Sequence, residues 1–176
     1  MKNMKNIILL ILTITLFLSG CEKDDICDAN TPTTPRLIIE FYNSASPSEL
    51  KPVDDLKLIS DIEGIDTTFA DVTRIAVPLQ TTADVTRYRF VLNYNSTDPA
   101  LIYEDTLEFN YTRENIFVSR ACGYKTLFTL NDNPELPDGV ILNDDPNTDL
   151  GSWIDNIVVE KNNLETENEV HIRILF

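Results

Sequence analysis

The residues most suited to chemistry in this chain are its three cysteines, and the first of them, Cys21, closes the run from Leu18 to Cys21. Lys2 and Lys5 precede an uncharged apolar run from Ile7 to Leu18, which is the layout of a secretory signal. That run is too short to cross a bilayer as a helix, which needs about 20 residues. We therefore expect residues 1–20 to be a lipoprotein signal peptide and Cys21 to be lipidated. The alternative is an ordinary signal peptide with an incidental cysteine.

The other two cysteines, Cys27 and Cys122, remain as a pair once Cys21 carries lipid. Disulfides persist outside the inner membrane, so we predict a bridge between them, the alternative being two free buried thiols. A bridge closing a loop of about 100 residues would stabilise the fold by up to about 5 kcal/mol in the chain-entropy model. It would also shorten the free tether after Cys21 from about 50 Å, counted to Arg36, to about 20 Å. The end of the domain that carries Cys122 would then face the lipid.

Catalytic constellations are not apparent elsewhere. The single histidine, His171, falls on the polar phase of the last predicted strand, and we interpret it as facing solvent. Neither zinc spacing, a glycine-rich phosphate loop nor a nucleophile elbow is present. Acidic pairs occur at Asp54 and Asp55 and at Asp144 and Asp145, but a glycosidase needs carboxyls about 5 Å or 6.5–9.5 Å apart, a distance that sequence cannot give. We expect no enzyme and no cofactor.

A calcium site is a further hypothesis, because oxygen-bearing side chains alternate in one long loop. They are Asn143, Asp145, Asn147 and Asp149. Pro146 and a missing glycine depart from the helix-loop-helix calcium pattern, and a second acidic loop runs from Asn131 to Asp138. The alternative is a set of Asx turns whose side chains bind their own backbone.

Trp153, at the end of that long loop, is the candidate for an exposed aromatic platform that binds glycan. The placement that we favour puts its ring in the core or at the rim of the fold. Only the first placement gives the side chain a role in ligand binding.

Strands must position these residues, because apolar and polar side chains alternate with a two-residue period. Further strands are expected over residues 56–62, 72–79, 116–119 and 154–161, and no window has helical periodicity. The expected inner-face residues are Leu37, Ile39 and Phe41; Tyr88, Phe90, Leu92 and Tyr94; Leu107, Phe109 and Tyr111; Cys122, Tyr124, Thr126 and Phe128; and Val170, Ile172, Ile174 and Phe176.

The pattern predicts an all-β fold, an antiparallel β-sandwich of immunoglobulin-like shape with eight or nine strands. It would occupy residues 36–176 as a single domain, after an acidic, Pro- and Thr-rich leash over residues 21–35. The immunoglobulin tryptophan between paired cysteines is missing, since Trp153 follows both, so that superfamily is not assigned.

Charge limits the range of partners. The whole chain carries a formal charge of -15, and loss of the two signal-peptide lysines leaves 12 basic and 29 acidic side chains, or -17. Nucleic acids are bound by clustered lysine and arginine, so we expect no nucleic-acid partner.

One stretch of the sequence is more distinctive than the rest, namely the run Arg-Ala-Cys-Gly-Tyr-Lys at Arg120 to Lys125. Together with the opening from Cys21 to Cys27 and the strand from Arg36 to Asn43, it resembles a family of small Bacteroidota lipoproteins known only as a domain of unknown function. The resemblance supplies no activity.

Two short motifs are similar to signals of that phylum. A lysine and two acids directly after Cys21 resemble the signal for export to the outer face of the outer membrane; they are Lys23, Asp24 and Asp25. This favours cell-surface display, with the periplasmic face as the alternative. Thr67 and Thr106 lie in tripeptides that look like the O-glycosylation sequence of the phylum.

These observations predict a non-catalytic cell-envelope lipoprotein that is held by its lipid anchor and binds or scaffolds another envelope protein. The C-terminal strand from Val170 to Phe176 is the expected site for strand addition by that partner. The alternative is a glycan-binding accessory module that uses Trp153 and the acidic loops. A hydrolase acting through paired carboxylates is the third hypothesis.

Overall fold

The computed structural model describes residues 26–62, 64–142 and 151–176. Within these ranges the chain forms twelve β-strands and one short 3-10 helix, η2 (Pro99–Leu101). No helix in the described part of the chain is long and apolar enough to cross a membrane.

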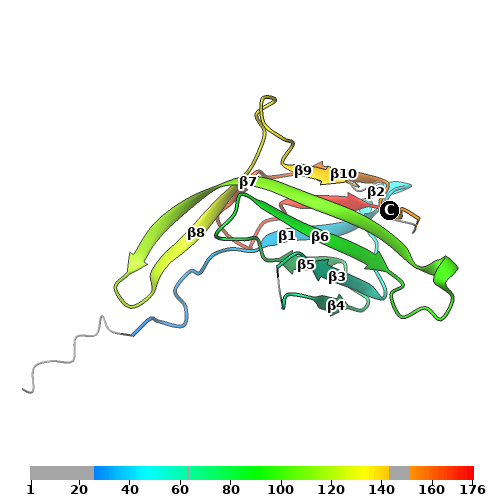
Figure 1. Ribbon diagram of the computed structural model, residues 1–176, viewed down its shortest axis with the longest axis horizontal. Helices are drawn as coiled ribbons and strands as arrows, with labels where there is room; N and C mark the ends of the chain where they lie inside the picture. Colours follow the sequence, from blue (N-terminus) through cyan, green and yellow to red (C-terminus); the bar gives the residue numbers. More distant parts are fainter. Residues whose placement is uncertain (1–25, 63, 143–150) are drawn as a thin grey trace, which may run out of the picture. The chain divides into compact units, whose positions relative to one another are not determined.

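The chain divides into two compact units; Figure 1 shows the strands that the chain forms. The smaller unit combines Met1–Thr33 with Ile116–Lys125, and the larger combines Thr34–Asn115 with Thr126–Phe176. The larger unit therefore contains most of the domain expected from the sequence, whereas the ten residues around Cys122 group with the N-terminal segment.

Two sheets are built from these strands. The five-stranded sheet has the order β10 (Asn156–Val159), β12 (Ile172–Leu175), β1 (Leu37–Asn43) and β2 (Ser46–Leu50), with β5 (Arg74–Val77) also paired to β1. The seven-stranded sheet has the order β11 (Asn163–Leu164), β8 (Gly123–Leu130), β7 (Tyr103–Ser119), β6 (Val85–Leu92), β3 (Leu56–Ser60) and β4 (Thr67–Phe69), with β9 (Val140–Leu142) also paired to β7.

Antiparallel pairing dominates, and a long ladder joins β6 and β7 from Val85 opposite Asn110 to Leu92 opposite Tyr103. The exception is β1, which pairs in parallel with β12. A parallel pair needs a long connection, and here the two strands come from opposite ends of the described domain.

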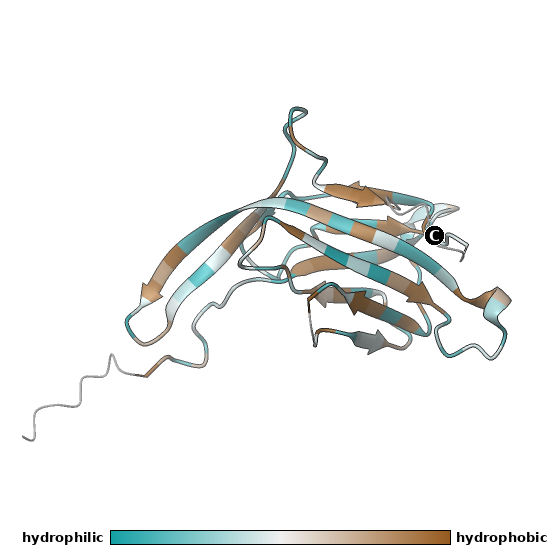
Figure 2. Cartoon of the chain, in the orientation of Figure 1, coloured by the Kyte–Doolittle hydropathy of each residue, from teal (hydrophilic) through white to brown (hydrophobic). Residues whose placement is uncertain are grey.

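The larger unit has one hydrophobic core to which both sheets contribute. Hydropathy alternates along β6 and β7, as the banding in Figure 2 shows, because successive strand residues point to opposite faces. Fully buried core residues include Leu37, Ile39, Phe41, Ile172 and Ile174 from the first sheet and Tyr88, Phe90, Leu107, Phe109, Tyr111 and Phe128 from the second. The predicted all-β sandwich is confirmed.

The strand number exceeds the predicted eight or nine because several strands are short or fully exposed. β11 has two residues, β4 and β9 have three, and every residue of β2 is exposed. A segment of that kind carries no two-residue hydrophobic period, which is the signal that a sequence provides.

Alternation also assigned some faces wrongly. Tyr124, expected to point inward, has 70% of its surface exposed, and Cys122 lies in the turn before β8 rather than in a strand. Ile38 and Val91, which alternate with the expected inner-face residues of their strands, are buried as well. The period fixes which residues share a face, but neighbouring segments decide whether that face is covered.

Candidate functional site

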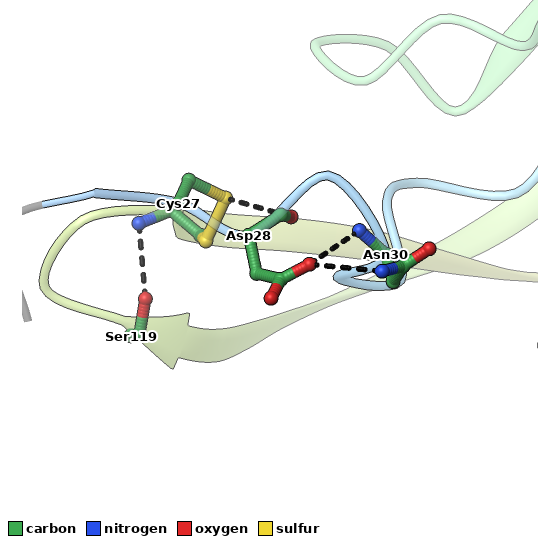
Figure 3. Close-up of a disulfide and its surroundings, with 5 residues drawn as sticks. Cys27, Asp28, Asn30 and Ser119 are labelled. Carbon is green, nitrogen blue, oxygen red and sulfur yellow. Dashed lines mark hydrogen bonds between the residues drawn. A yellow bond between two sulfur atoms is a disulfide. The ribbon is translucent and has the colours of Figure 1, made fainter.

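The disulfide between Cys27 and Cys122 is present in the smaller unit, so the predicted pairing is confirmed (Figure 3). Their Cα atoms are 4.9 Å apart across a sequence separation of 95 residues. Cys122 belongs to the turn between β7 and β8, where its amide donates to Oγ of Ser119 at 3.0 Å. Gly123 follows with φ of 71°, a left-handed conformation that favours glycine.

The segment after Cys27 is organised by its own turn. Oδ1 of Asp28 accepts hydrogen bonds from the backbone amide of Asn30 at 2.8 Å and from its side-chain amide at 3.2 Å (Figure 3). The amide of Thr31 donates to the carbonyl oxygen of Asp28 at 2.9 Å. Such an Asx turn fixes the backbone that leaves the disulfide.

The larger unit has an open groove of about 530 Å³, which we call the Asn110 groove. Its polar wall is held by Arg113, whose Nε donates to Oδ1 of Asp84 at 2.6 Å. Nδ2 of Asn110 donates to Oε1 of Glu108 and to the carbonyl oxygen of Asp138, both at 3.0 Å. Leu136, with 45% of its surface exposed, adds an apolar side.

A second hollow of about 490 Å³ lies beside Ile38 and Arg74. It is bordered by Glu167, which accepts from Nε of Arg36 at 2.8 Å and from Nη2 of Arg36 at 2.6 Å. These hydrogen bonds lower the pKa of Glu167 below its usual 4.5 and raise the pKa of Arg36. Nη2 of Arg74 donates to the carbonyl oxygen of Glu167, so two arginines hold this loop in place.

His171 is fully buried, and the expectation that it faces solvent is wrong. Its Nδ1 accepts a hydrogen bond from the amide of Ile38 at 2.9 Å, which holds the ring against the sheet. Its Nε2 has no hydrogen-bond partner within the described residues. Burial lowers the pKa of His171 below 6.5, so the ring is neutral and serves the fold.

Trp153 is 9% exposed and lies in the core, which agrees with the favoured core-or-rim placement and not with an exposed ligand platform. Its ring packs edge-on against Phe176, with centroids 5.1 Å apart, and Nε1 donates to the carbonyl oxygen of Phe90 at 3.0 Å. The indole therefore meets both its apolar and its polar requirements inside the protein. Its burial removes the surface that a glycan would stack on.

Asp105 holds the chain around Trp153, a role that the alternation did not reveal. The carboxylate is fully buried in β7 and accepts from Oγ of Ser152 at 2.6 Å and from the amides of Trp153 and Ile154 at 2.7 and 2.8 Å. A signal was available, because Asp105 occupies the same phase as the core residue Leu107. An acid on the inner face of a strand needs donors, and here it finds three.

Two other buried carboxylates lie on the opposite face of β7. Glu104 accepts from Nη1 of Arg89 at 3.2 Å, and Glu108 accepts from Nε of Arg87 at 2.5 Å. The Cα atoms of these two residues are about 13 Å apart along the strand, since each residue adds about 3.3 Å. Each carboxylate is engaged by a guanidinium group.

The acidic loop candidates are only partly described. Within the described residues no group of three or more His, Cys, Asp and Glu side chains is placed to hold a metal ion. In the loop from Asn131 to Asp138, Oδ1 of Asn133 accepts from the amide of Glu135 at 3.0 Å, which is the Asx-turn alternative. The other candidates, Asn143, Asp144, Asp145, Asn147 and Asp149, lie outside the described residues.

The remaining predicted sites fall into two groups. Thr67 is exposed in β4, and Thr106 is half-buried in β7. The lipidation and export residues lie outside the described residues; they are Cys21, Lys23, Asp24 and Asp25.

A protein-family model described as "Family of unknown function (DUF6452)" matches residues 59–176 of the chain. This range includes Cys122 but not Cys27. Neither the curated proteins nor the solved structures give a significant match.

Proposed function

The chain belongs to the DUF6452 family of unknown function, and we propose that it is a non-catalytic, lipid-anchored module of the cell envelope that binds or scaffolds another envelope component. The anchor is Cys21, at the end of the signal-like N-terminus. The β-sandwich is the part that meets the partner.

The disulfide carries this proposal. The chain has three cysteines, and pairing of Cys27 with Cys122 leaves Cys21 as the thiol available for lipid. Structural disulfides belong to oxidising compartments, which a protein reaches by export. The lipidation box and the bridge are independent features that favour the same destination.

Display on the outer face of the outer membrane is part of the proposal. It is supported by Lys23, Asp24 and Asp25, which resemble the export signal of Bacteroidota lipoproteins. The exposed position of Thr67 is compatible with glycosylation during export.

The partner surface must differ from the one expected from the sequence. β12, which contains most of the predicted strand-addition segment, lies between β10 and β1, so both of its edges are occupied and that prediction is wrong. β10 ends the same sheet and has the apolar sequence Ile157 to Val159. The opposite end strand, β2, contains Pro47, which lacks an N–H group. We assign the edge of β10 to the partner strand.

Lipidation is tested by substituting Cys21→Ser and, as the matched control, Cys27→Ser in a bacterial host that processes lipoproteins. Labelled fatty acid should be incorporated into the wild type and the Cys27→Ser variant but not into the Cys21→Ser variant. A Cys21→Ser protein that still carries the label would contradict the anchor. Protease treatment of intact cells, with residues 23–25 changed to alanine as the comparison, tests surface display.

The partner edge is tested by crosslinking in membranes at native expression. The wild type should enrich one stoichiometric partner, and Val159→Lys should reduce it because a charge blunts an open strand edge. Val159 is 40% exposed, and Leu101, at 51%, provides the control Leu101→Lys outside the sheets. Equal enrichment by both variants would exclude the β10 edge.

The structure bears differently on the other two hypotheses. Burial of Trp153 leaves the glycan-binding alternative without its aromatic platform. For the hydrolase alternative, the buried carboxylates Glu104 and Glu108 are each ion-paired with an arginine, and Asp144 and Asp145 lie outside the described residues.

A further inference from the structure

Resting on the proposed lipid anchor at Cys21, we propose that the disulfide unit is a membrane-contact surface. The disulfide unit is defined here by its described residues, 26–33 and 116–125. Its exposed apolar side chains would enter the bilayer interface, and its two cations would meet anionic headgroups. The lipid would then hold the protein at the membrane, and this surface would set the orientation of the disulfide unit against the bilayer.

The apolar part of the surface consists of three highly exposed side chains. Ile26 is 82% exposed, Tyr124 is 70% exposed and Phe117 is 56% exposed. The rings of Phe117 and Tyr124 pack together with centroids 5.4 Å apart. Ile26 precedes the cysteine that is bonded to Cys122, so the disulfide groups all three residues within one small unit. Exposed aromatic and aliphatic clusters of this kind mark interaction surfaces.

The hairpin part of the disulfide unit differs in charge from the whole chain. Residues 116–125 contain Arg120 and Lys125 and no acid, a net charge of +2 in a chain of -15, whereas the acids of this region precede Thr33 in the N-terminal segment. Arg120 and Lys125 form no salt bridge with another described residue. Phenylalanine and tyrosine beside lysine and arginine are the residue types that occupy the water interface of membranes.

Chain length places this surface at the bilayer. Six residues from Cys21 to Cys27 reach at most about 20 Å when extended. The Cα atom of Cys122 is 4.9 Å from that of Cys27, so the hairpin turn lies no more than about 25 Å from the lipidated residue. A lipid surface is therefore the occupant that the short tether and the two hairpin cations favour.

The test uses the lipidated full chain in vesicles that contain phosphatidylcholine with brominated acyl chains and anionic phosphatidylglycerol. Phe117→Trp places a reporter in the disulfide unit, and Leu101→Trp places a matched exposed reporter in η2 of the larger unit. The native Trp153 is buried, and its fluorescence, measured in the wild type, is subtracted from the fluorescence of both reporter variants. Bromine quenching of Phe117→Trp should be roughly threefold stronger than that of Leu101→Trp, because an interfacial aromatic residue lies beside the acyl chains.

The outcomes separate this proposal from the anchor. Equal quenching of the two reporters in protein that floats with the vesicles would overturn the membrane-contact surface and leave the anchor intact. Protein that does not float would refute the anchor instead. A reporter at Phe117 that shifts its emission only when native envelope proteins are added would replace the lipid with a protein partner and overturn the proposal.

The cations have their own test. Arg120→Gln combined with Lys125→Gln should abolish the increase in quenching that phosphatidylglycerol produces in the Phe117→Trp protein, because the charge attraction is lost. Lys57→Gln with Lys161→Gln, both at the surface of the larger unit, is the control of equal charge change. The same dependence on phosphatidylglycerol in both double variants would contradict a specific role for Arg120 and Lys125.

Discussion

Ile38 and His171 hold one another by two reciprocal hydrogen bonds. The amide of Ile38 donates to Nδ1 of His171 at 2.9 Å, and the amide of His171 donates to the carbonyl oxygen of Ile38 at 3.0 Å. The two residues stand 133 positions apart, so these bonds join the first and last strands of the domain. Nδ1 can accept only while it carries no proton.

Stability should therefore fall as the solution becomes mildly acidic. The pKa of His171 is lower in the folded protein than its usual 6.5, because burial disfavours the charged ring. Its contribution is present above that value and is lost as the pH falls through the folded-state pKa. Urea unfolding should give a smaller unfolding free energy at about pH 5.5 than at about pH 7.5.

His171→Asn is the control for this effect, because an amide oxygen can accept from Ile38 but does not titrate. Its stability should change less across the same interval. Glu167 does not interfere, since its pKa is lowered from 4.5 by Arg36 and its contribution is lost only at still lower pH. An identical pH dependence in the wild type and the variant would contradict the role of His171.

Asp105→Ala should be among the most damaging single changes in the larger unit. It would leave the amides of Trp153 and Ile154 buried without their acceptor, at a cost of about 3 kcal/mol in unfolding free energy. Asp105→Asn retains one acceptor oxygen and should lose less. Chemical denaturation of both variants tests this order, and an alanine variant as stable as the wild type would refute it.

Removal of the disulfide should destabilise the protein through the unfolded chain. The double substitution Cys27→Ser and Cys122→Ser releases a cross-link across 95 residues, and we expect a loss of about 2–5 kcal/mol. Mass spectrometry of the alkylated wild type should find neither thiol free. Equal denaturation midpoints for the two proteins would show that the bridge contributes no stability.

Trp153 is the only tryptophan, so native fluorescence should report the core directly. Its emission should be blue-shifted in the folded protein and move to longer wavelength on unfolding. Trp153→Ala should cost about 3–5 kcal/mol because it leaves a cavity beside Phe41 and Phe176, whereas Trp153→Phe should cost less. Native emission at the wavelength of free tryptophan would contradict the buried position.

The local sequence was enough to predict which residues form strands and which cysteines pair. Leu37, Ile39 and Phe41 show their common face through a two-residue period that belongs to the backbone itself. Cys27 and Cys122 were the pair left once Cys21 was assigned to lipid. Neither inference required knowledge of which segments meet in space.

The functional reading of single residues was decided by tertiary structure. His171 has a polar side chain at an outward phase, yet it is buried because Ile38 offers it a backbone donor from the other end of the chain. Trp153 follows a predicted loop in the sequence, yet it is buried, because its amide donates to Asp105 and its indole N–H donates to the carbonyl oxygen of Phe90. Burial and hydrogen bonding depend on segments distant in sequence, so the chain alone determined its strands and its sulfur chemistry, while the packing of the sheets decided which surfaces remain free to bind.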